Sequence, residues 1–149
     1  MTNPILRLGL ITIVSYLFMG MIVPPVHEEY DWYVTGGVSF SEFGFWIDGG
    51  GDVNGDGYDD IIIGAPTYTH DLISEGAVVI YFGSASGLSA EPDWVEYGEQ
   101  SNSGYGHCVS INGDVNGDGY DDVLIGAHQY KGMWINEGKV RGFIRVGRM

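Results

Sequence analysis

The sequence predicts an all-β fold built from two copies of one repeating unit. Ten consecutive residues, 51–60, recur without change as residues 113–122, which is 62 positions later (113 − 51 = 62). Each copy is followed by a short apolar run, at residues 61–65 and 123–127. The 149 residues include 25 glycines and 13% aromatic residues, a composition typical of strands joined by tight turns. A period of this length indicates one supersecondary unit that occurs twice.

The first 26 residues differ from the rest of the chain. Arg7 precedes an uncharged apolar run over residues 8–23, which a Pro-Pro pair ends. A short positive flank before an apolar core is typical of an export signal. Residues 1–26 are therefore interpreted as a cleaved signal peptide or as an uncleaved signal-anchor, in which residues 8–23 hold the chain to a membrane. A buried strand or helix is the third interpretation. The first two predict an exported protein, secreted or at the cell surface.

From residue 31 onward, the repeat predicts strands at matching positions. They are expected at residues 32–35 and 94–97, 43–47 and 105–111, 60–65 and 122–127, and 76–82 and 138–146. The repeat units are residues 31–92 and 93–149, and the second unit stops before its closing turn. Runs such as residues 61–63 and 78–82 are too apolar for a half-solvated sheet, which predicts that other sheets stack on them.

The charge of the chain limits the kinds of molecule that it is expected to bind. The net charge is −14, and every basic residue except Arg7 lies within residues 131–149. Because an acidic body repels phosphate backbones, no nucleic-acid partner is expected. Lys139, Arg141 and Arg145 alternate on one face of the last strand, which predicts a solvent-facing side or a guarded edge. The alternative is that residues 145–149 are the aberrant end of a truncated reading frame. The single cysteine, Cys108, cannot form an internal disulfide and is expected to be buried as a small apolar residue.

Each identical segment has the donor pattern of a calcium-binding loop. Oxygen-bearing side chains stand at its first, third and fifth positions, and a glycine at the sixth permits a sharp turn. An EF-hand also needs a glutamate at the twelfth position between helices, but Ile63 and Ile125 stand there and the flanks favour strands. Dockerin modules, which share the opening of the loop, are excluded for the same reasons. The alternative of a plain acidic turn leaves the exact recurrence of a nine-residue ligand pattern unexplained.

The sequence resembles the FG-GAP repeat, the blade unit of the integrin α-chain β-propeller and of many secreted bacterial proteins. The resemblance covers about residues 31–144 and rests on Phe43-Gly44 and Tyr105-Gly106, the two acidic loops, and Gly64-Ala65-Pro66, for which the second unit has Gly126-Ala127-His128. It implies β-propeller-type blades, formed by two FG-GAP repeats of which the second is incomplete. Propellers close with about 4–8 blades. The chain is therefore expected to be part of a longer propeller or to assemble with other copies as a homo-oligomer.

The resemblance also implies calcium at two sites per chain. The implied ligands are the side chains of Asp52, Asn54, Asp56 and Asp60 with the Tyr58 carbonyl, and the side chains of Asp114, Asn116, Asp118 and Asp122 with the Tyr120 carbonyl. Five hard oxygen donors suit calcium better than magnesium, which requires a tighter octahedron. Asp59 and Asp121, at the eighth position, are expected to point into solvent. A structural role is expected for the ion, because the clustered carboxylates repel one another without it.

The expected function is a non-enzymatic, calcium-binding extracellular module for adhesion or for recognition of a protein or glycan. No nucleophile elbow or phosphate-binding loop occurs in the sequence. Four aromatic residues at or near loops could form a binding rim: Trp46, Tyr68, Tyr130 and Trp134. The second hypothesis is an accessory domain or fragment of a larger exported enzyme, such as a hydrolase, because a propeller fold hosts many activities.

Overall fold

The computed structural model describes residues 32–143. The predicted export segment, residues 1–26, therefore lies outside the described residues, as does the end of the last predicted strand. Residues from Val34 onward form one compact unit, and the architecture below is that of this unit. In the part of the chain that is described, no helix has the length and apolar character needed to cross a membrane.

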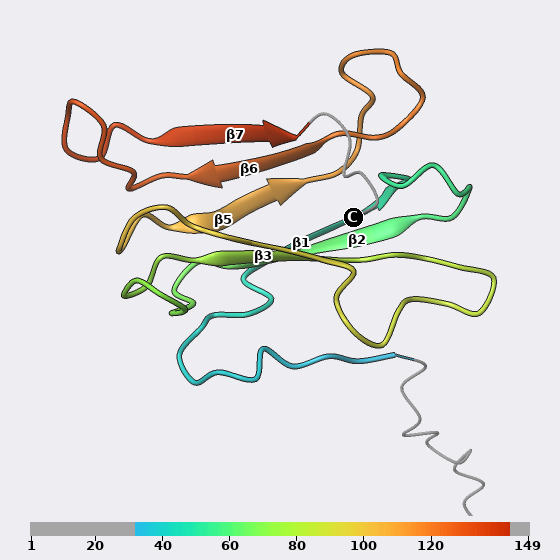
Figure 1. Ribbon diagram of the computed structural model, residues 1–149, viewed down its shortest axis with the longest axis horizontal. Helices are drawn as coiled ribbons and strands as arrows, with labels where there is room; N and C mark the ends of the chain where they lie inside the picture. Colours follow the sequence, from blue (N-terminus) through green and yellow to red (C-terminus); the bar gives the residue numbers. More distant parts are fainter. Residues whose placement is uncertain (1–31, 144–149) are drawn as a thin grey trace, which may run out of the picture. The chain divides into compact units, whose positions relative to one another are not determined.

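Within the described residues, seven strands form two antiparallel sheets (Figure 1). The first sheet contains β1 (Trp46–Gly51), β2 (Asp60–Ala65), β3 (Ala77–Tyr81) and β4 (Trp94–Tyr97), and the second contains β5 (Tyr105–Ser110), β6 (Val123–Ala127) and β7 (Lys139–Phe143). In both sheets, strands that are consecutive in the chain are neighbours in space. The prediction of an all-β fold is confirmed, and the two sheets do not close into a ring.

The division into two sheets does not coincide with the division into two sequence units, because it falls one strand later in the chain. β4 belongs to the second sequence unit but pairs with β3 of the first, so that Ala77 faces Tyr97 and Ile80 faces Trp94. The predicted strand at residues 32–35, which corresponds to β4, was wrong for this chain, because these residues have no regular secondary structure. β4 itself is held by its pairing with β3, which precedes it in the chain.

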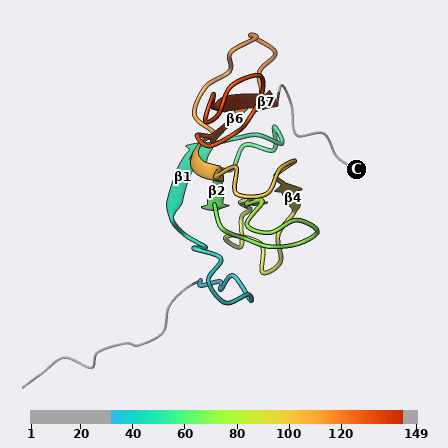
Figure 2. The same cartoon turned by 90° about the vertical axis from the view of Figure 1, so that its left-hand side faces the viewer.

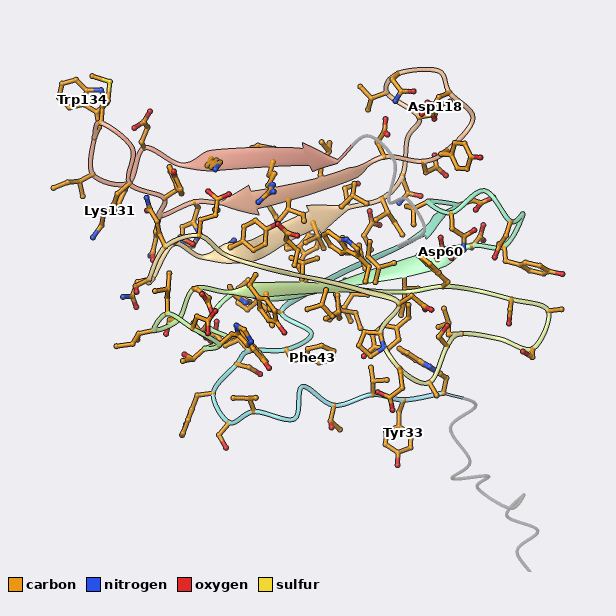
Figure 3. All side chains as sticks on the ribbon, viewed as in Figure 1. Tyr33, Phe43, Asp60, Asp118, Lys131 and Trp134 are labelled. Carbon is orange, nitrogen blue, oxygen red and sulfur yellow. The ribbon has the colours of Figure 1, made fainter. Side chains whose placement is uncertain are left out.

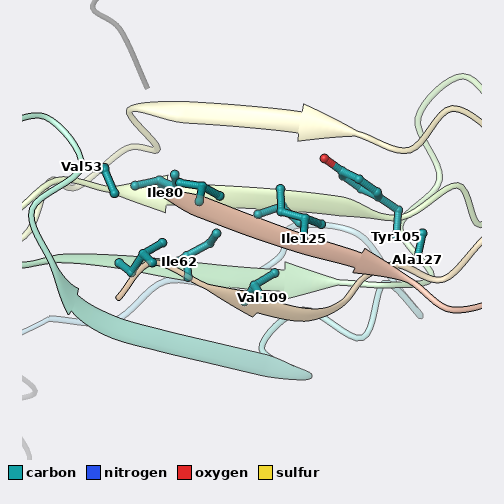
Figure 4. Close-up of a cluster of buried hydrophobic side chains, with 10 residues drawn as sticks. Val53, Ile62, Ile80, Tyr105, Val109, Ile125 and Ala127 are labelled. Atoms are coloured by element: carbon teal, nitrogen blue, oxygen red, sulfur yellow. The ribbon is translucent and has the colours of Figure 1, made fainter. Parts of the chain in front are cut away.

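The two sheets pack against each other and share one apolar core (Figures 1 and 2). The buried members, drawn in Figure 4, are Val53, Ile62, Val78, Ile80, Tyr105, Val109, Ile111, Val123, Ile125 and Ala127. They come from both sheets, so each sheet removes the apolar face of the other from water. Full burial of one such aliphatic side chain is worth about 1.5–3 kcal/mol. The prediction of stacked sheets is confirmed for this face.

Glycines allow the two sheets to approach closely. A Cβ atom on Gly64, in β2, would overlap the carbonyl oxygen of Gly106 in β5. A Cβ on Gly51, at the end of β1, would overlap the carbonyl oxygen of Ile111. Backbone stands opposite backbone at both points, so no side chain can move aside to make room.

The alternating charges of β7 lie on an edge strand of the described sheet, one of the two placements that the sequence predicted. They are paired rather than open to solvent: the Lys139 Nζ lies 2.8 Å from Glu99, and an Arg141 nitrogen lies 2.8 Å from Glu96, in β4. These pairs link β7 to the first sheet, although their partial exposure limits their contribution to stability. The prediction that Cys108 is buried was wrong: it is exposed, because on β5 it points away from the interface that its neighbour Val109 enters.

Candidate metal centres

The first candidate centre is the loop that connects β1 to β2, and Asp52 organises its backbone. The Oδ1 atom of Asp52 accepts hydrogen bonds from the backbone N–H groups of Gly55 (2.7 Å) and Asp56 (3.1 Å), and Oδ2 accepts one from Gly57 (2.8 Å). Gly55 and Gly57 have φ values of 74° and 88°, a region that glycine enters without steric cost. The loop therefore wraps around the carboxylate at its first position.

The third and fifth positions of this loop lie beside the first. Asn54 Oδ1 accepts a hydrogen bond from the N–H of Asp56 (2.8 Å), and Asn54 Nδ2 donates one to Asp56 Oδ2 (3.1 Å). Asp56 Oδ1 in turn accepts from the N–H of Tyr58 (3.0 Å). The structure therefore brings together Asp52, Asn54 and Asp56, with the backbone of Tyr58 next to them.

Asp60 occupies the base of the loop rather than its mouth. It is fully buried, and its carboxylate accepts hydrogen bonds from the N–H groups of Val53 (2.9 Å) and Gly83 (2.8 Å). Burial raises the pKa of Asp60 above its usual value, and the negative charges of Asp56 and Asp52 raise it further, although the two hydrogen bonds act in the opposite direction. Asp60 thus ties the loop to the end of β3 and lies within electrostatic reach of the other carboxylates.

The second candidate centre, between β5 and β6, repeats the same arrangement. Asp114 accepts hydrogen bonds from the N–H groups of Gly117 (2.7 Å), Asp118 (3.0 Å) and Gly119 (2.8 Å). These bonds, that of Gly119 above all, hold the pKa of Asp114 below its usual value. Asn116 Nδ2 donates to Asp118 Oδ2 (3.2 Å), and Asp118 accepts from the N–H of Tyr120 (3.1 Å). The loop is exposed, with Asp118 near its tip (Figure 3).

The carboxylate of Asp122 closes the second loop but uses only one of its oxygens. Oδ2 accepts a hydrogen bond from the N–H of Val115 (2.8 Å). Oδ1 is buried and accepts no hydrogen bond from any residue that the structure describes. A buried carboxylate oxygen without a partner is costly, and a bound cation is one of the groups that could satisfy it.

The donor chemistry of both loops fits a calcium ion, but the ligand set is not fully gathered. Each loop offers three carboxylates, one amide and one carbonyl, all of them hard oxygen donors. Among residues 32–143, however, no group of three or more acidic, histidine or cysteine side chains is placed to hold a metal ion. The ninth-position carboxylates, those of Asp60 and Asp122, are not gathered with the other ligands, because backbone N–H groups hold them at the base of each loop.

Comparison with known proteins identifies the repeating unit. The family model of the FG-GAP repeat matches residues 43–81 and 112–142. The chain contains FG-GAP repeats. Together with the two antiparallel sheets, these repeats indicate propeller blades, as the sequence predicted.

The relatives found among curated proteins are integrin α chains. Chicken (Gallus gallus) integrin alpha-8 is 38% identical over 98 residues, which are 63% of this chain and 9% of that protein. Human integrin alpha-6 is 40% identical over 91 residues, which are 61% of this chain and 7% of that protein. Drosophila melanogaster integrin alpha-PS2 is 40% identical over 83 residues. The chain spans less than a tenth of the length of each of these relatives.

The two FG-GAP repeats meet at the glycines that characterise them. Gly64 belongs to the Gly-Ala-Pro of the first repeat, and Gly106 follows Tyr105 at the Phe-Gly position of the second. An added Cβ on Gly64 would overlap the carbonyl oxygen of Gly106, and one on Gly106 would meet the carbonyl oxygen of Ala77 at 2.6 Å. Both glycines are therefore needed where one blade docks on the next.

The two FG-GAP loops are also joined to each other, through a residue that sequence reasoning assigned to solvent. Asp121 Oδ2 accepts a hydrogen bond from the N–H of Asp52 (2.8 Å), and Oδ1 accepts one from the N–H of Gly113 (3.1 Å). The prediction that Asp121 points away was wrong, because the neighbouring blade supplies a donor. Asp59 is exposed, as predicted.

A second inter-blade carboxylate, that of Asp48, was missed by sequence reasoning. It accepts hydrogen bonds from the N–H of Ile111 (3.1 Å) and from Asn112 Nδ2 (2.9 Å). Burial would raise the pKa of Asp48, but these and other hydrogen bonds together hold it below its usual value. The available signal was a departure from the repeat, since Ser110 occupies the corresponding place in the second unit.

The four aromatic residues considered for a binding rim have different environments. Tyr130 packs against the core beneath Lys139, whose Nζ lies 4.7 Å from the ring centroid. Tyr68 stacks on Tyr97. Trp46 and Trp134 are exposed, and Trp134 is 72% accessible. Trp134 is therefore the member of this set that is most available to a partner.

Proposed function

We propose that the chain is a calcium-stabilised extracellular module for adhesion or recognition of a protein or glycan. The calcium loops occupy one end of its blades, and the recognition surface occupies the opposite end. The FG-GAP repeats and the integrin α relatives support an adhesion role and an exported location. The observation that carries the proposal is a group of exposed apolar side chains on the β2–β3 and β6–β7 loops. We call this group the apolar end: Leu72, Ile73, Met133, Trp134 and Ile135.

The topology separates the apolar end from the calcium loops. In an antiparallel meander, successive connections lie at opposite ends of the sheet. The calcium loops are the β1–β2 and β5–β6 connections, whereas the apolar end belongs to the β2–β3 and β6–β7 connections. Figure 3 shows Trp134 and Asp118 at opposite ends of the second sheet. A partner can therefore contact the apolar end without disturbing the ion sites.

The connection between β4 and β5 joins the two loops of the apolar end into one surface. The N–H of Asn102 donates to the carbonyl oxygens of Ile73 (3.0 Å) and Ser74 (2.9 Å). Gln100 exchanges two hydrogen bonds with the backbone of Lys131, at 2.8 and 3.0 Å. These bonds fix the loops of both repeats to one connecting segment. Exposed aromatic and aliphatic side chains on a fixed surface are typical of interaction sites.

Calcium is proposed to act as a structural ion in both loops. The residues that would hold it are the side chains at the first, third, fifth and ninth positions with the carbonyl at the seventh. The ion supplies a divalent charge that offsets the repulsion among these carboxylates. Because Asp121 of the second loop holds the backbone of Asp52 in the first, ordering one loop would also favour order in the other.

Replacing Asp56 by alanine is expected to remove one of two calcium ions bound per chain. The loss of stability should be about 1–2 kcal/mol at about 1 mM calcium, given dissociation constants on the order of 10⁻⁴ M for extracellular modules. In chelator, the variant should differ little from the unchanged chain. Calorimetric calcium titration and thermal unfolding measure both effects. The control is Asp59→Ala, which changes an exposed acid at the eighth position; equal losses with and without calcium would contradict a structural ion.

Replacing Trp134 by alanine is expected to weaken ligand binding about tenfold or more, since an exposed aromatic anchor commonly dominates an interface. Binding would be measured by surface plasmon resonance of the full chain against panels of purified matrix proteins and glycans. The matched control is Val115→Ala, which truncates an exposed side chain on a calcium loop at the opposite end. A ligand whose affinity depends on Val115 and not on Trp134 would place recognition elsewhere.

A further inference from the structure

Each of the two acidic loops contains an asparagine that is followed by glycine, a dipeptide in which asparagine deamidates readily. The pairs are Asn54–Gly55 and Asn116–Gly117, at the third and fourth loop positions. In this reaction the backbone nitrogen of the next residue attacks the side-chain amide carbon, and glycine leaves that nitrogen accessible because it has no Cβ. A third pair, Asn112–Gly113, lies just before the second loop. The surroundings of the three pairs decide which of them can react.

In the closed first loop, the groups that deamidation uses are engaged in hydrogen bonds. The attacking nitrogen, that of Gly55, donates its N–H to Asp52 Oδ1 (2.7 Å). Asn54 Oδ1 accepts from the N–H of Asp56 (2.8 Å), and Asn54 Nδ2 donates to Asp56 Oδ2 (3.1 Å). The carboxylate of Asp52 also disfavours the negative charge that must develop on the attacking nitrogen. Deamidation therefore requires the loop to open.

The second loop holds the same groups in the same way. The N–H of Gly117 donates to Asp114 Oδ1 (2.7 Å), and the side-chain amide of Asn116 is bonded to Asp118 through both of its polar atoms (2.8 and 3.2 Å). Asn116 and Gly117 are exposed, as is Gly55 in the first loop. Exposed backbone hydrogen bonds belong to the part of a structure that opens locally without global unfolding. Water can reach the amide as soon as a loop opens.

A cation bound in a loop would oppose this opening. In the proposed function, Asp52, Asn54 and Asp56 are ligands of one ion, which would hold them together, whereas without the ion the carboxylates repel one another. An ion that binds only the closed loop lowers the population of the open loop by the factor 1 + [Ca²⁺]/Kd. With a dissociation constant on the order of 10⁻⁴ M, this factor is about ten at about 1 mM calcium.

We propose that Asn54 and Asn116 are deamidation sites that calcium protects, an inference that rests on the calcium role proposed above. When a loop opens, the glycine nitrogen loses its proton and bonds to Cγ of the asparagine, while the Cγ–Nδ2 bond breaks and ammonia leaves with that proton. Water then opens the resulting succinimide ring at one of its two carbonyl groups. The products are aspartate and isoaspartate, in which the backbone runs through the side chain. The reaction requires water alone and no redox partner.

Both products change the third ligand position of the loop. Aspartate replaces a neutral amide with a further carboxylate beside those of the first, fifth and ninth positions. Isoaspartate lengthens the backbone by one carbon before the fourth position, which displaces the later ligands relative to the first. A loop that stays without calcium would therefore be altered irreversibly, and isoaspartate in particular is expected to weaken its affinity for the ion.

Asn112–Gly113 is an internal control, because the neighbouring blade holds its amide. Asn112 Nδ2 donates to Asp48 Oδ1 (2.9 Å) and to the carbonyl oxygen of Gly49 (3.2 Å), and the N–H of Gly113 donates to Asp121 Oδ1 (3.1 Å). None of these residues is a proposed calcium ligand. Deamidation at Asn112 should therefore be slow both with and without calcium while the two blades stay packed.

The ring of Tyr120, from the second loop, covers the reacting backbone of the first loop. A Cβ atom added to Gly55 would overlap this ring, so that Tyr120 restricts the movement that brings the Gly55 nitrogen to the amide of Asn54. Tyr58 occupies the corresponding position in the first loop and is 44% accessible. In chelator, Tyr120→Ala is expected to accelerate deamidation at Asn54, whereas the matched change Tyr58→Ala should leave that rate unchanged.

Peptide mapping by mass spectrometry measures the three rates in one molecule. The full chain is incubated in mild detergent at mildly alkaline pH, with calcium or with chelator, and the exchange of an NH₂ group for OH is followed at each asparagine. Deamidation at Asn54 and Asn116 is expected to be about tenfold slower at about 1 mM calcium than in chelator, with no change at Asn112. An equal acceleration at all three asparagines in chelator would indicate global unfolding and would overturn local control by the loops.

Calorimetric calcium titration of the same preparation separates this inference from the proposed structural ion. If calcium binds and Asn54 and Asn116 still deamidate equally fast with and without it, the inference is wrong and the ion site remains. If the two loop asparagines react no faster than Asn112 in chelator, they are not deamidation sites, whether or not calcium binds. If the titration detects no binding, the proposed ion and the protection by calcium both fail.

Discussion

Replacing Gly64 by alanine is expected to lower the free energy of unfolding by about 3 kcal/mol, the upper end of the usual cost of overpacking. The added methyl group would overlap the carbonyl oxygen of Gly106, on the strand of the second sheet that faces β2. Backbone cannot rotate away as a side chain can. The two sheets would have to separate, and Ile62 and Ile80 would lose part of their burial against the second sheet. Urea unfolding followed by tryptophan fluorescence measures the loss.

The corresponding change in the second repeat, Gly126→Ala, is the control for Gly64→Ala. Here the added methyl group first meets the side chain of Cys108, which is exposed and free to adopt another rotamer. The expected loss is below about 1 kcal/mol. Equal losses at the two positions would contradict the view that blade docking is what Gly64 permits.

The strands were predictable because their signals are local. β2 and β6 follow identical acidic loops and are almost wholly apolar, and both were placed within one residue of their positions. The strand predicted at residues 43–47 was less accurate: residues 43–45 precede β1, which begins at Trp46 and ends at Gly51. Gly44, with a φ of 86°, interrupts the extended conformation before the strand begins.

The pairing of β4 was not predictable, because it depends on a partner distant in the sequence. Residues 32–35 and 94–97 share the same pattern, yet within the described residues it is the second segment that pairs with a strand, β3. Similarly, the alternating charges of β7 indicated a solvent-facing side, whereas the structure places Glu96 and Glu99 opposite them. Sequence periodicity identifies the faces of a strand but not what lies against each face.

The candidate metal centres show the same division between local and distant determinants. The close grouping of Asp52, Asn54 and Asp56 follows from their spacing, because each side chain accepts a hydrogen bond from the backbone two to five residues ahead. The position of Asp60 does not follow from local spacing, because one of its hydrogen-bond donors, Gly83, lies after β3. The inter-blade roles of Asp48 and Asp121 depend on donors that the neighbouring blade supplies.

Replacing Glu75 by alanine is expected to lower the free energy of unfolding by about 3 kcal/mol. Glu75 is 2% accessible, and its carboxylate accepts hydrogen bonds from three consecutive backbone N–H groups, those of His70 (2.8 Å), Asp71 (2.8 Å) and Leu72 (3.2 Å). Each donor left without a partner costs about 1–3 kcal/mol where water cannot reach it. The same bonds shape the β2–β3 loop, so the variant should also bind more weakly through the apolar end.

Glu137 provides the matched control for Glu75, because it occupies the corresponding position in the second repeat. It is exposed, and among the described residues its carboxylate accepts only a 3.3 Å hydrogen bond from the N–H of Trp134. Glu137→Ala is therefore expected to cost less than about 1 kcal/mol. Urea unfolding of the two variants separates the effect of burial from that of residue type. If Glu137→Ala lowered the free energy of unfolding as much as Glu75→Ala, the burial of Glu75 would not be the reason for its effect.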